Sequence, residues 1–246
     1  MDAENSIQEL SSDALSSDHK KNSQDISVII PVLNESDGLA DLDQHLGLFF
    51  FGEVIYVDGG STDGSWEWLQ KNVDCVIQSD AGRAIQMNAG AKKASKDYLL
   101  FLHADTRLPE QASRQILKGL DVHSWGWFDV NFFGNDWLLS IVARCMNLRS
   151  RLTGVSTGDQ GLFLERSVFF DIDGFDEIPL MEDVAITKRL KNLSRPFCSK
   201  ARIITSSRRW HENGRLKTIL LMWRLRWKYY RGESPETLRR YYQDVR

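Results

Sequence analysis

The stretch that most constrains the fold lies between residues 54 and 65. Its first four residues are apolar and mostly β-branched, and they run into Asp58, two glycines and a cluster of residues that commonly cap helices. This order is typical of a buried parallel strand that turns into a helix, and ligands bind in open α/β sheets at the carboxyl ends of such strands. We therefore expect the Asp58 carboxylate to face a crevice, with Gly59 and Gly60 allowing a sharp turn. The plainer alternative is an acid that only caps the helix.

Strands and helices alternate along the chain, with short loops in the first half. The apolar patterns there predict strands over 26–32, 53–57, 74–78 and 98–102, and helices over 37–46, 64–72 and 82–90. The second half is less regular, with strands expected over 125–132, 162–164 and 202–206, and helices over 136–151, after residue 183, over 216–230 and from Pro235. This order predicts an α/β fold: a mixed, mainly parallel, Rossmann-like central sheet flanked by helices, plus C-terminal helices.

Composition narrows the class of protein. The chain has 246 residues, 42% of them hydrophobic and 26% charged, which suits one globular domain, and its net charge of −3 gives no reason to expect a nucleic-acid partner. Three scattered cysteines predict neither a disulfide framework nor a zinc site. No apolar run reaches the length of about 18 residues that indicates a spanning helix. Residues 1–25 are polar and unlike a signal peptide, so we expect a disordered leader and a cytoplasmic protein.

Acidic residues fall at the ends of predicted elements: Asp58, Asp105 and the pair Glu182-Asp183. Carboxylates that follow parallel strands meet in one crevice. Such a site suits a divalent metal bound to a diphosphate, because Mg²⁺ takes few protein ligands and fills its shell with phosphate oxygens and water. A carboxylate on the opposite wall, such as Asp183, could take a proton from a hydroxyl nucleophile. For Glu182 and Asp183 the alternative is helix capping, which the helix dipole favours.

Several motifs occur in a fixed order along the chain, at residues 31–35, 57–64, 103–106 and 182–183. Together they resemble the family-2 glycosyltransferases with the GT-A fold. Further motifs are similar to one subgroup, associated with arsenosugar biosynthesis and radical-SAM proteins; they lie at 82–84, 86–88, 147–151, 158–160 and 179–183. The resemblance covers about residues 26–231. It implies a nucleotide-binding half over about 26–107, an acceptor half over 108–214 and C-terminal helices over 215–246.

The resemblance implies transfer of a sugar, with inversion at the anomeric carbon, from a nucleoside diphosphate sugar to a hydroxyl of a small or lipid-like acceptor. The donor is expected to be linked to UDP. Asp105 matches the last acid of the DxD motif, which binds Mg²⁺ or Mn²⁺ and the donor diphosphate. Asp183 matches the general base, with Glu182 beside it as a second catalytic candidate. The positions that match the nucleotide and donor side are Pro31, Asn34, Glu35, Asp58, Gly59, Arg83 and Asn88.

The chain departs from the family pattern at two places. His103 replaces the first acid of DxD; imidazole can bind a metal, so His103 is a second candidate ligand, and the alternative is a hydrogen-bonded structural histidine. The QxxRW motif of processive members keeps Arg209 and Trp210 but has serine at the glutamine position, which predicts a non-processive enzyme. Arg209 and Trp210 are expected on the acceptor side, or else at a surface strand end. Asp159 and Gln160 either face donor sugar and acceptor or form a simple turn.

The helix over 216–230 mixes basic and aromatic residues. This pattern suits peripheral contact with a membrane surface, or else a helix packed on the core with snorkelling lysines and arginines. Two other classes of protein compete with a glycosyltransferase. One is a nucleotidyltransferase, although residues 34–37 lack the glycine-rich basic loop that usually follows the first strand of that class. The other is a catalytically silent module that binds sugar nucleotides.

Overall fold

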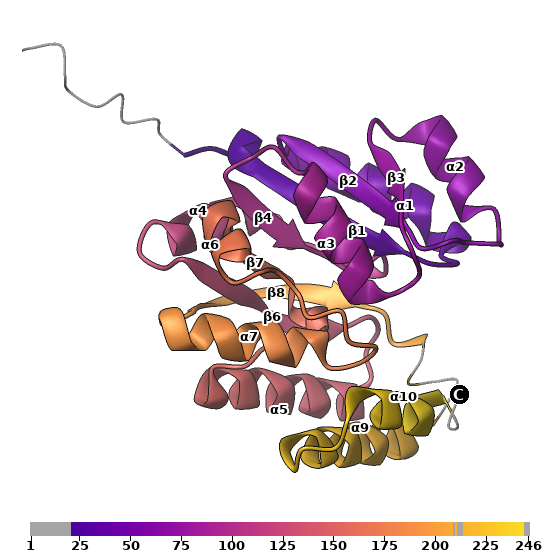
Figure 1. Ribbon diagram of the computed structural model, residues 1–246, viewed down its shortest axis with the longest axis vertical. Coiled ribbons are helices and arrows are strands. Elements are labelled where there is room, and N and C mark those ends of the chain that lie inside the picture. The colour runs from indigo at the N-terminus through magenta and orange to yellow at the C-terminus, as the bar shows by residue number, and fades with distance from the viewer. Residues whose placement is uncertain (1–20, 209, 211–213, 244–246) are drawn as a thin grey trace, which may run out of the picture.

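Figure 1 shows the computed structural model, which describes residues 21–208, 210 and 214–243. Its strands are β1 (Ile26–Val32), β2 (Glu53–Asp58), β3 (Val76–Gln78), β4 (Tyr98–Phe101), β5 (Thr106–Arg107), β6 (Trp125–Phe132), β7 (Leu162–Glu165) and β8 (Phe197–Thr205). They form an eight-stranded sheet in the order β3-β2-β1-β4-β7-β6-β8-β5. The pairs β2–β3, β1–β2, β1–β4 and β6–β8 are parallel, and the other three pairs are antiparallel. The predicted mixed, mainly parallel sheet is confirmed.

The helices cover both faces of the sheet (Figure 1). They are α1 (Ser36–Leu46), α2 (Ser65–Asn72), α3 (Arg83–Lys93), α4 (Ala112–Leu120), α5 (Trp137–Thr153), α6 (Arg166–Asp171), α7 (Glu182–Leu193), α9 (Arg215–Tyr230) and α10 (Pro235–Gln243). Short 3-10 turns occur at Ser23–Asp25, Gly47–Phe49 and Gly158–Gln160. Helices α4 and α6 and strand β5 were not predicted from the sequence. Helix α6 and strand β5 have only six and two residues, so they offer little periodicity to recognise. Helix α4 was overlooked, although Ala112, Ile116 and Leu120 give it a clear apolar face.

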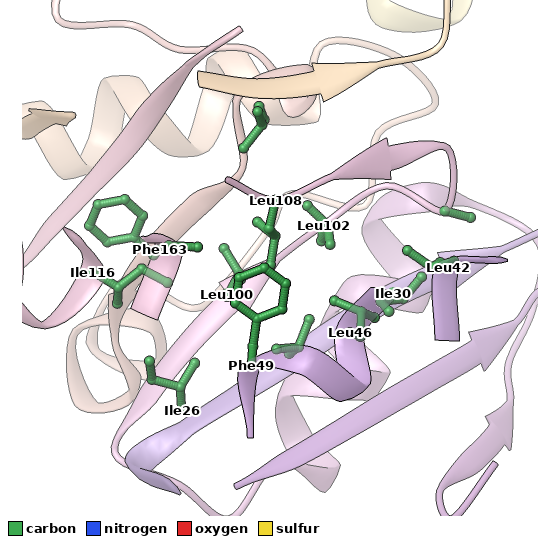
Figure 2. Close-up of a cluster of buried hydrophobic side chains, with 14 of the residues drawn as sticks. Ile26, Ile30, Leu42, Leu46, Phe49, Leu100, Leu102, Leu108, Ile116 and Phe163 are labelled. Carbon is green, nitrogen blue, oxygen red and sulfur yellow. The ribbon is translucent and has the colours of Figure 1, made fainter. Parts of the chain in front are cut away.

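Two buried clusters hold the layers together, one on each face of the sheet. Side chains of α1 and α4 pack on one face, and Figure 2 shows Leu42 and Leu46 of α1 and Ile116 of α4 beside Ile30 and Leu100 of the strands. Side chains of α3, α6 and α7 pack on the other face. Alternate residues of β1 divide between the two clusters, because successive side chains of a strand point to opposite faces.

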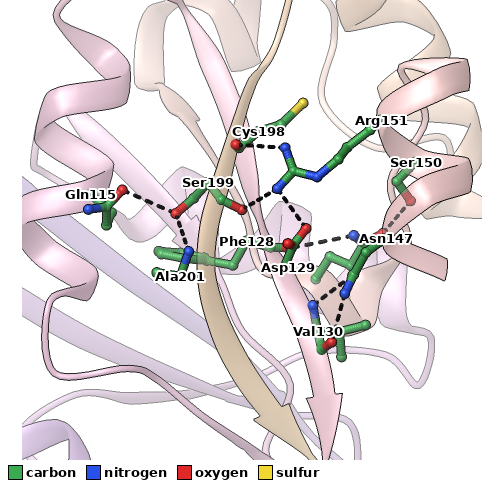
Figure 3. Close-up of polar contacts among 11 residues, drawn as sticks. Gln115, Phe128, Asp129, Val130, Asn147, Ser150, Arg151, Cys198, Ser199 and Ala201 are labelled. Atoms are coloured by element: carbon green, nitrogen blue, oxygen red, sulfur yellow. Dashed lines mark hydrogen bonds and ion pairs between the residues drawn. The ribbon is translucent and has the colours of Figure 1, made fainter. Parts of the chain in front are cut away.

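Helix α5 is fixed to the second half of the sheet by polar contacts (Figure 3). The Asn147 side chain donates to the Val130 carbonyl at 3.0 Å and accepts from the Val130 N–H at 2.9 Å. One turn later, the Arg151 guanidinium donates to the Asp129 carboxylate at 2.9 Å and to the carbonyls of Cys198 and Ser199 on β8. The motif at 147–151 therefore serves to join α5, β6 and β8.

Regular structure begins earlier along the chain than the sequence predicts. The sequence predicts disorder up to residue 25, but Ser23–Asp25 forms a 3-10 turn with Asn22 as its cap. Lys21 also donates a hydrogen bond to the Leu120 carbonyl. Residues 1–20 lie outside the described residues. Strand β8 likewise starts five residues before the predicted strand at 202, with a register irregularity opposite residues 128 and 129.

The C-terminal helices α9 and α10 pack against the start of α7. Leu225 of α9 and Leu238 of α10 are buried with Val155, Met181 and Val184. Among the described helices, none has the length and apolar content that crossing a membrane requires.

Candidate functional site

The turn after β2 is organised by Asp58, which is fully buried. Its Oδ2 atom accepts hydrogen bonds from the N–H groups of Gly60 at 2.9 Å and Ser61 at 3.1 Å. Its Oδ1 atom is also buried and finds no hydrogen-bond partner among the described residues. Since a buried acceptor without a partner is costly, one oxygen shapes the turn and the other is available to a donor group on a ligand.

The loop after β1 is joined to this turn by hydrogen bonds in both directions. Asn34, with a left-handed φ of 56°, donates its N–H to Ser61 Oγ at 2.9 Å and accepts from the Thr62 N–H at 2.8 Å. Glu35 donates its N–H to Ser65 Oγ at 3.0 Å, and its carboxylate lies 3.4 Å from the Arg208 guanidinium. Pro31 lies in β1 beside Val57. The sequence motifs at 31–35 and 57–64 thus form one rim of the carboxyl edge of the sheet.

Gln86 of α3 supports this rim from beneath. Its buried Nε2 donates to the carbonyls of Val32 and Val57 at 2.8 Å each, so it bridges the ends of β1 and β2. A Cβ atom on Gly59 would lie 3.0 Å from this side-chain amide. The glycine is therefore needed for the close approach of Gln86. From the sequence, Gln86 was named only as part of the motif at 86–88 and was given no role.

A small pocket, open to solvent, lies at the same edge of the sheet. Arg83, at the start of α3, lines one side, and Glu182 and Asp183, at the start of α7, line another. The Arg83 guanidinium lies 3.6 Å from the Glu182 carboxylate, which is almost fully buried. Met181 just before this pair has a left-handed φ of 71°, a conformation uncommon for a residue other than glycine. This backbone turn directs the first residues of α7 into the pocket.

Asp183 is held by the turn at residues 158–160. Its Oδ2 accepts the Gly158 N–H at 2.8 Å, and its Oδ1 accepts the Val184 N–H at 2.7 Å. The His103 ring, which follows β4, packs against Gly158 so closely that a Cβ there would lie 2.6 Å from His103 Nε2. His103 Nδ1 lies 3.4 Å from the Asp159 carboxylate. The structure thus brings His103, Asp159 and Asp183 together around one glycine.

Charge is concentrated in this pocket. Burial, with the neighbouring Asp183 carboxylate, raises the pKa of Glu182, although Arg83 opposes the rise. Burial acts to lower the pKa of Arg83, but the charges of Glu182, Asp159 and Asp183 outweigh it and raise that pKa. Burial and the neighbouring Arg226 lower the pKa of Arg149 to about 10. Arg149 is a charged group near Asp183 that the motif at 147–151 included without assigning it a role.

Other predicted site residues have their polar atoms engaged within the fold. Asn88 donates to the Phe175 carbonyl and accepts from the Phe175 N–H, both at 2.9 Å. Gln160 is buried, and its Oε1 accepts from Ser150 Oγ at 2.7 Å and from the Thr157 N–H at 3.1 Å. These contacts give both side chains a positioning role.

The predicted acceptor residues at the end of the chain are only partly described. Trp210 packs its ring edge-on against Phe132, with centroids 5.4 Å apart. Arg209 lies outside the described residues.

The predicted metal ligands can be tested for fit. Across the part of the chain that the structure describes, no three His, Cys, Asp or Glu side chains gather as an all-protein metal site would need. His103 lines the pocket, with Nδ1 3.4 Å from the Asp159 carboxylate and a buried Nε2 that packs against Gly158 and has no hydrogen-bond partner among the described residues. Asp105 is half-buried in the turn between β4 and β5, next to Thr106 Oγ1 at 3.5 Å. One carboxylate fits a metal that completes its shell with diphosphate oxygens and water.

Known proteins resemble this chain in sequence and in fold. Residues 27–138 match the family model described as glycosyl transferase family 2. The poly-β-1,6-N-acetyl-D-glucosamine synthase of Staphylococcus aureus is 27% identical over 189 residues, covering 67% of this chain and 45% of that protein. The chain thus spans about half the length of this curated relative.

Solved structures show the same fold. TarS 1-349 from S. aureus in complex with UDP matches with a TM-score of 0.57 and 19% identity, over 74% of this chain and 60% of that one. The mannosyltransferase PcManGT from Pyrobaculum calidifontis, in complex with GDP-Man and Mn²⁺, matches with a TM-score of 0.54 and 15% identity, over 75% and 57% of the two chains. Residues 27–138 therefore resemble family-2 glycosyltransferases, and the chain has a GT-A-like fold.

Proposed function

We propose that the protein transfers a sugar once, with inversion, from a UDP-linked sugar to a hydroxyl of a small or lipid-like acceptor, with the help of a divalent metal. The observation that carries the proposal is the held position of Asp183. Both of its oxygens accept backbone N–H groups, at 2.8 Å from Gly158 and 2.7 Å from Val184, and it faces the pocket that Arg83 lines from α3. A fixed carboxylate opposite a basic residue is what a base and a leaving-group site require.

On the donor side, the unpartnered Oδ1 of Asp58 is suited to accept an N–H of the nucleobase. The loop with Asn34 and Glu35 closes over the nucleoside, and Gln86 and Asn88 hold α3 in place beneath it. Arg83 begins α3, so both its charge and the helix N-terminus favour the diphosphate. Glu182 holds the Arg83 guanidinium in the pocket until that diphosphate binds.

On the acceptor side, Asp183 takes the proton of the attacking hydroxyl while the sugar–phosphate bond breaks on the opposite face of the anomeric carbon. When bound, a divalent metal supplies Lewis-acid stabilisation of the departing diphosphate, and Asp105 is the residue that we propose to hold it. Asp159 and Trp210 lie on this side as candidate contacts to donor sugar and acceptor. Serine in place of the glutamine of QxxRW supports a single transfer.

Two lines of support come from the similar structures. TarS was solved with UDP, and PcManGT with GDP-Man and Mn²⁺. We extend to this chain the use of a sugar nucleotide and of a divalent metal. We also propose that the protein works in the cytoplasm in the arsenosugar-associated subgroup, and that α9, with its basic and aromatic side chains, brings it to a membrane surface.

Calorimetric titration of UDP with Mn²⁺, and again with a chelator, tests the donor site. We expect metal-dependent binding with a micromolar Kd, lost in Asp105→Ala. Equal affinity with metal and chelator would defeat the metal assignment, and binding of GDP without UDP would overturn the choice of base.

The Asp183→Asn variant separates the proposal from its alternatives. We expect UDP binding to persist while sugar transfer falls by at least about 100-fold, because the base is lost and the site is kept. Unchanged transfer would remove Asp183 from the role of base. Release of pyrophosphate from a nucleoside triphosphate would instead identify a nucleotidyltransferase, and binding without turnover of any sugar nucleotide would identify a silent module.

A further inference from the structure

Helix α9 exposes a continuous apolar stripe. Five large side chains on it are 55–70% exposed and repeat at alternating steps of four and three residues: Leu216, Leu220, Trp223, Trp227 and Tyr230. At about 100° per residue, these positions lie on the face opposite Thr218 and Leu225, the two buried residues of the helix. The stripe therefore points away from the core.

Helix α5 has a second stripe of the same kind. Trp137, Ile141, Leu148 and Leu152 are exposed by 72%, 45%, 58% and 77%. They lie opposite the buried face of α5, which includes Leu139 and Ala143. Such an exposed set of large apolar side chains is unusual on a helix that otherwise packs against the sheet.

The two helices lie along each other in the lower part of Figure 1. At their starts, the Arg215 guanidinium of α9 lies 2.9 Å from the carboxylate of Asp136, the N-cap of α5. Eleven residues further on, Arg226 of α9 is close enough to Arg149 of α5 to lower its pKa. The two helices therefore start together and run in the same direction, with Arg149 and Arg226 on the sides that face each other. With these sides facing, the helical repeat turns both stripes to the same outer side of the molecule.

This outer side, the α5–α9 face, is bordered by basic side chains. Arg144 of α5 and Lys217 and Arg224 of α9 are exposed, and neither helix contains an acid. The whole chain, in contrast, has a net charge of −3. Tryptophan, tyrosine and leucine bordered by arginine and lysine are the composition of a surface that enters the headgroup region of a bilayer.

We propose that the α5–α9 face docks onto a membrane surface that contains anionic lipids. Its apolar stripes enter the boundary between headgroups and acyl chains, and its arginines and lysines pair with lipid phosphates. The docking needs both helices, whereas the sequence pattern alone pointed only to α9.

The position of the face gives the docking a functional consequence. Leu225 of α9 packs beside Met181 and Val184, which flank the pair Glu182-Asp183. Because Leu225 lies opposite the exposed stripe, α9 separates the proposed base from the docked bilayer by about one helix diameter, roughly 10 Å, and a lipid-like acceptor would have to reach around this helix. This consequence rests on the proposed function, as does the membrane contact of α9; the added inference is the joint α5–α9 face.

Cosedimentation of the full chain with vesicles tests the docking. We expect binding to vesicles of equal parts phosphatidylglycerol and phosphatidylcholine, weakening as salt rises, and much weaker binding to phosphatidylcholine alone. Leu220→Gln in α9 and Leu152→Gln in α5 should each lower the affinity by about fivefold to tenfold, since each removes an apolar side chain from the bilayer contact.

Leu48→Gln is the matched control, because Leu48 is 70% exposed and Leu220 is 69% exposed, and Leu48 lies just after α1, outside the proposed face. It should bind vesicles like the wild type. A second pair of variants tests the role of charge. Arg144→Gln on α5 should weaken binding to anionic vesicles, whereas Arg114→Gln on α4, outside the proposed face, should not. UDP affinity, measured on every variant, should stay unchanged, so a failure of docking is distinguished from a failure of the proposed chemistry.

Three results would overturn the docking: no binding to anionic vesicles, equal binding to neutral and anionic vesicles, or equal losses in Leu220→Gln and Leu48→Gln. Sedimentation velocity tests whether a second copy of the chain, and not a membrane, binds this face. A dimer in the absence of lipid that Leu220→Gln and Leu152→Gln dissociate would assign the face to a second copy of the chain instead.

Discussion

Gly90 sets how closely α3 can approach the sheet, and replacing it with alanine tests that placement. A Cβ at this position would lie 2.4 Å from Ile29 Cγ2 and 3.0 Å from Val57 Cγ2. Ordinary carbon contacts need about 3.5 Å, so the helix would have to move by roughly 1 Å. Both contacts are branch methyls close to the backbone of fully buried strand residues, which cannot rotate away.

The expected magnitude follows from two opposing effects. Overpacking of this kind costs about 1–3 kcal/mol, whereas alanine is favoured over glycine inside a helix by about 1 kcal/mol. Gly38→Ala in α1 supplies the control, because no atom lies within 4 Å of its would-be Cβ. The helix preference then largely cancels between the two variants. Gly90→Ala should lie about 1–3 kcal/mol below Gly38→Ala in free energy of unfolding.

Urea denaturation of the two variants measures this difference, provided that the m-values agree. A double-mutant cycle with Ile29→Ala identifies the cause, because that change removes the Cγ2 atom that the new methyl meets. The double variant should lose less stability than the sum of the single losses. Equal stability of Gly90→Ala and Gly38→Ala, or strict additivity in the cycle, would refute the argument.

Three further predictions concern the site. The pKa of Glu182 is raised in the folded protein, so the folded state binds the proton more tightly than the unfolded state. The free energy of unfolding of the wild type, relative to Glu182→Gln, should therefore fall as the pH rises above the ordinary value of 4.5. Denaturation at a series of pH values checks this, and parallel curves of unfolding free energy against pH for the two proteins would contradict it. Asn88→Ala should lower the free energy of unfolding by about 1–3 kcal/mol, because it leaves the Phe175 N–H and carbonyl unpaired. The control Asn72→Ala loses one exposed hydrogen bond and should lower it by less than about 1 kcal/mol. Asp58→Asn should weaken UDP binding by at least about tenfold. In either orientation its amide NH₂ would meet an N–H donor, either the backbone N–H groups of Gly60 and Ser61 or that of the nucleobase. Titration calorimetry measures the Kd, and an unchanged Kd would exclude the contact.

The sequence was most informative where one local pattern decides the structure. The apolar run before Asp58 and the glycines after it could mean little other than a strand and a turn, and the sheet edge formed as expected. The same reasoning could not anticipate that Gln86 would bridge Val32 and Val57, because these residues are far apart in the chain. Motif resemblance marked Gln86, Asn88 and Gln160, but only their hydrogen bonds show that they position other groups.

His103 illustrates why a motif position does not fix a role. Its place in the pattern predicted either a metal ligand or a structural residue, and nothing local could decide between them. The structure adds Gly158, some 55 residues later, whose lack of a side chain lets the His103 ring pack against the turn that also holds Asp183. The histidine and the glycine thus support the proposed base together. We propose Asp105 and the donor diphosphate as the main metal ligands, so metal binding should require the nucleotide.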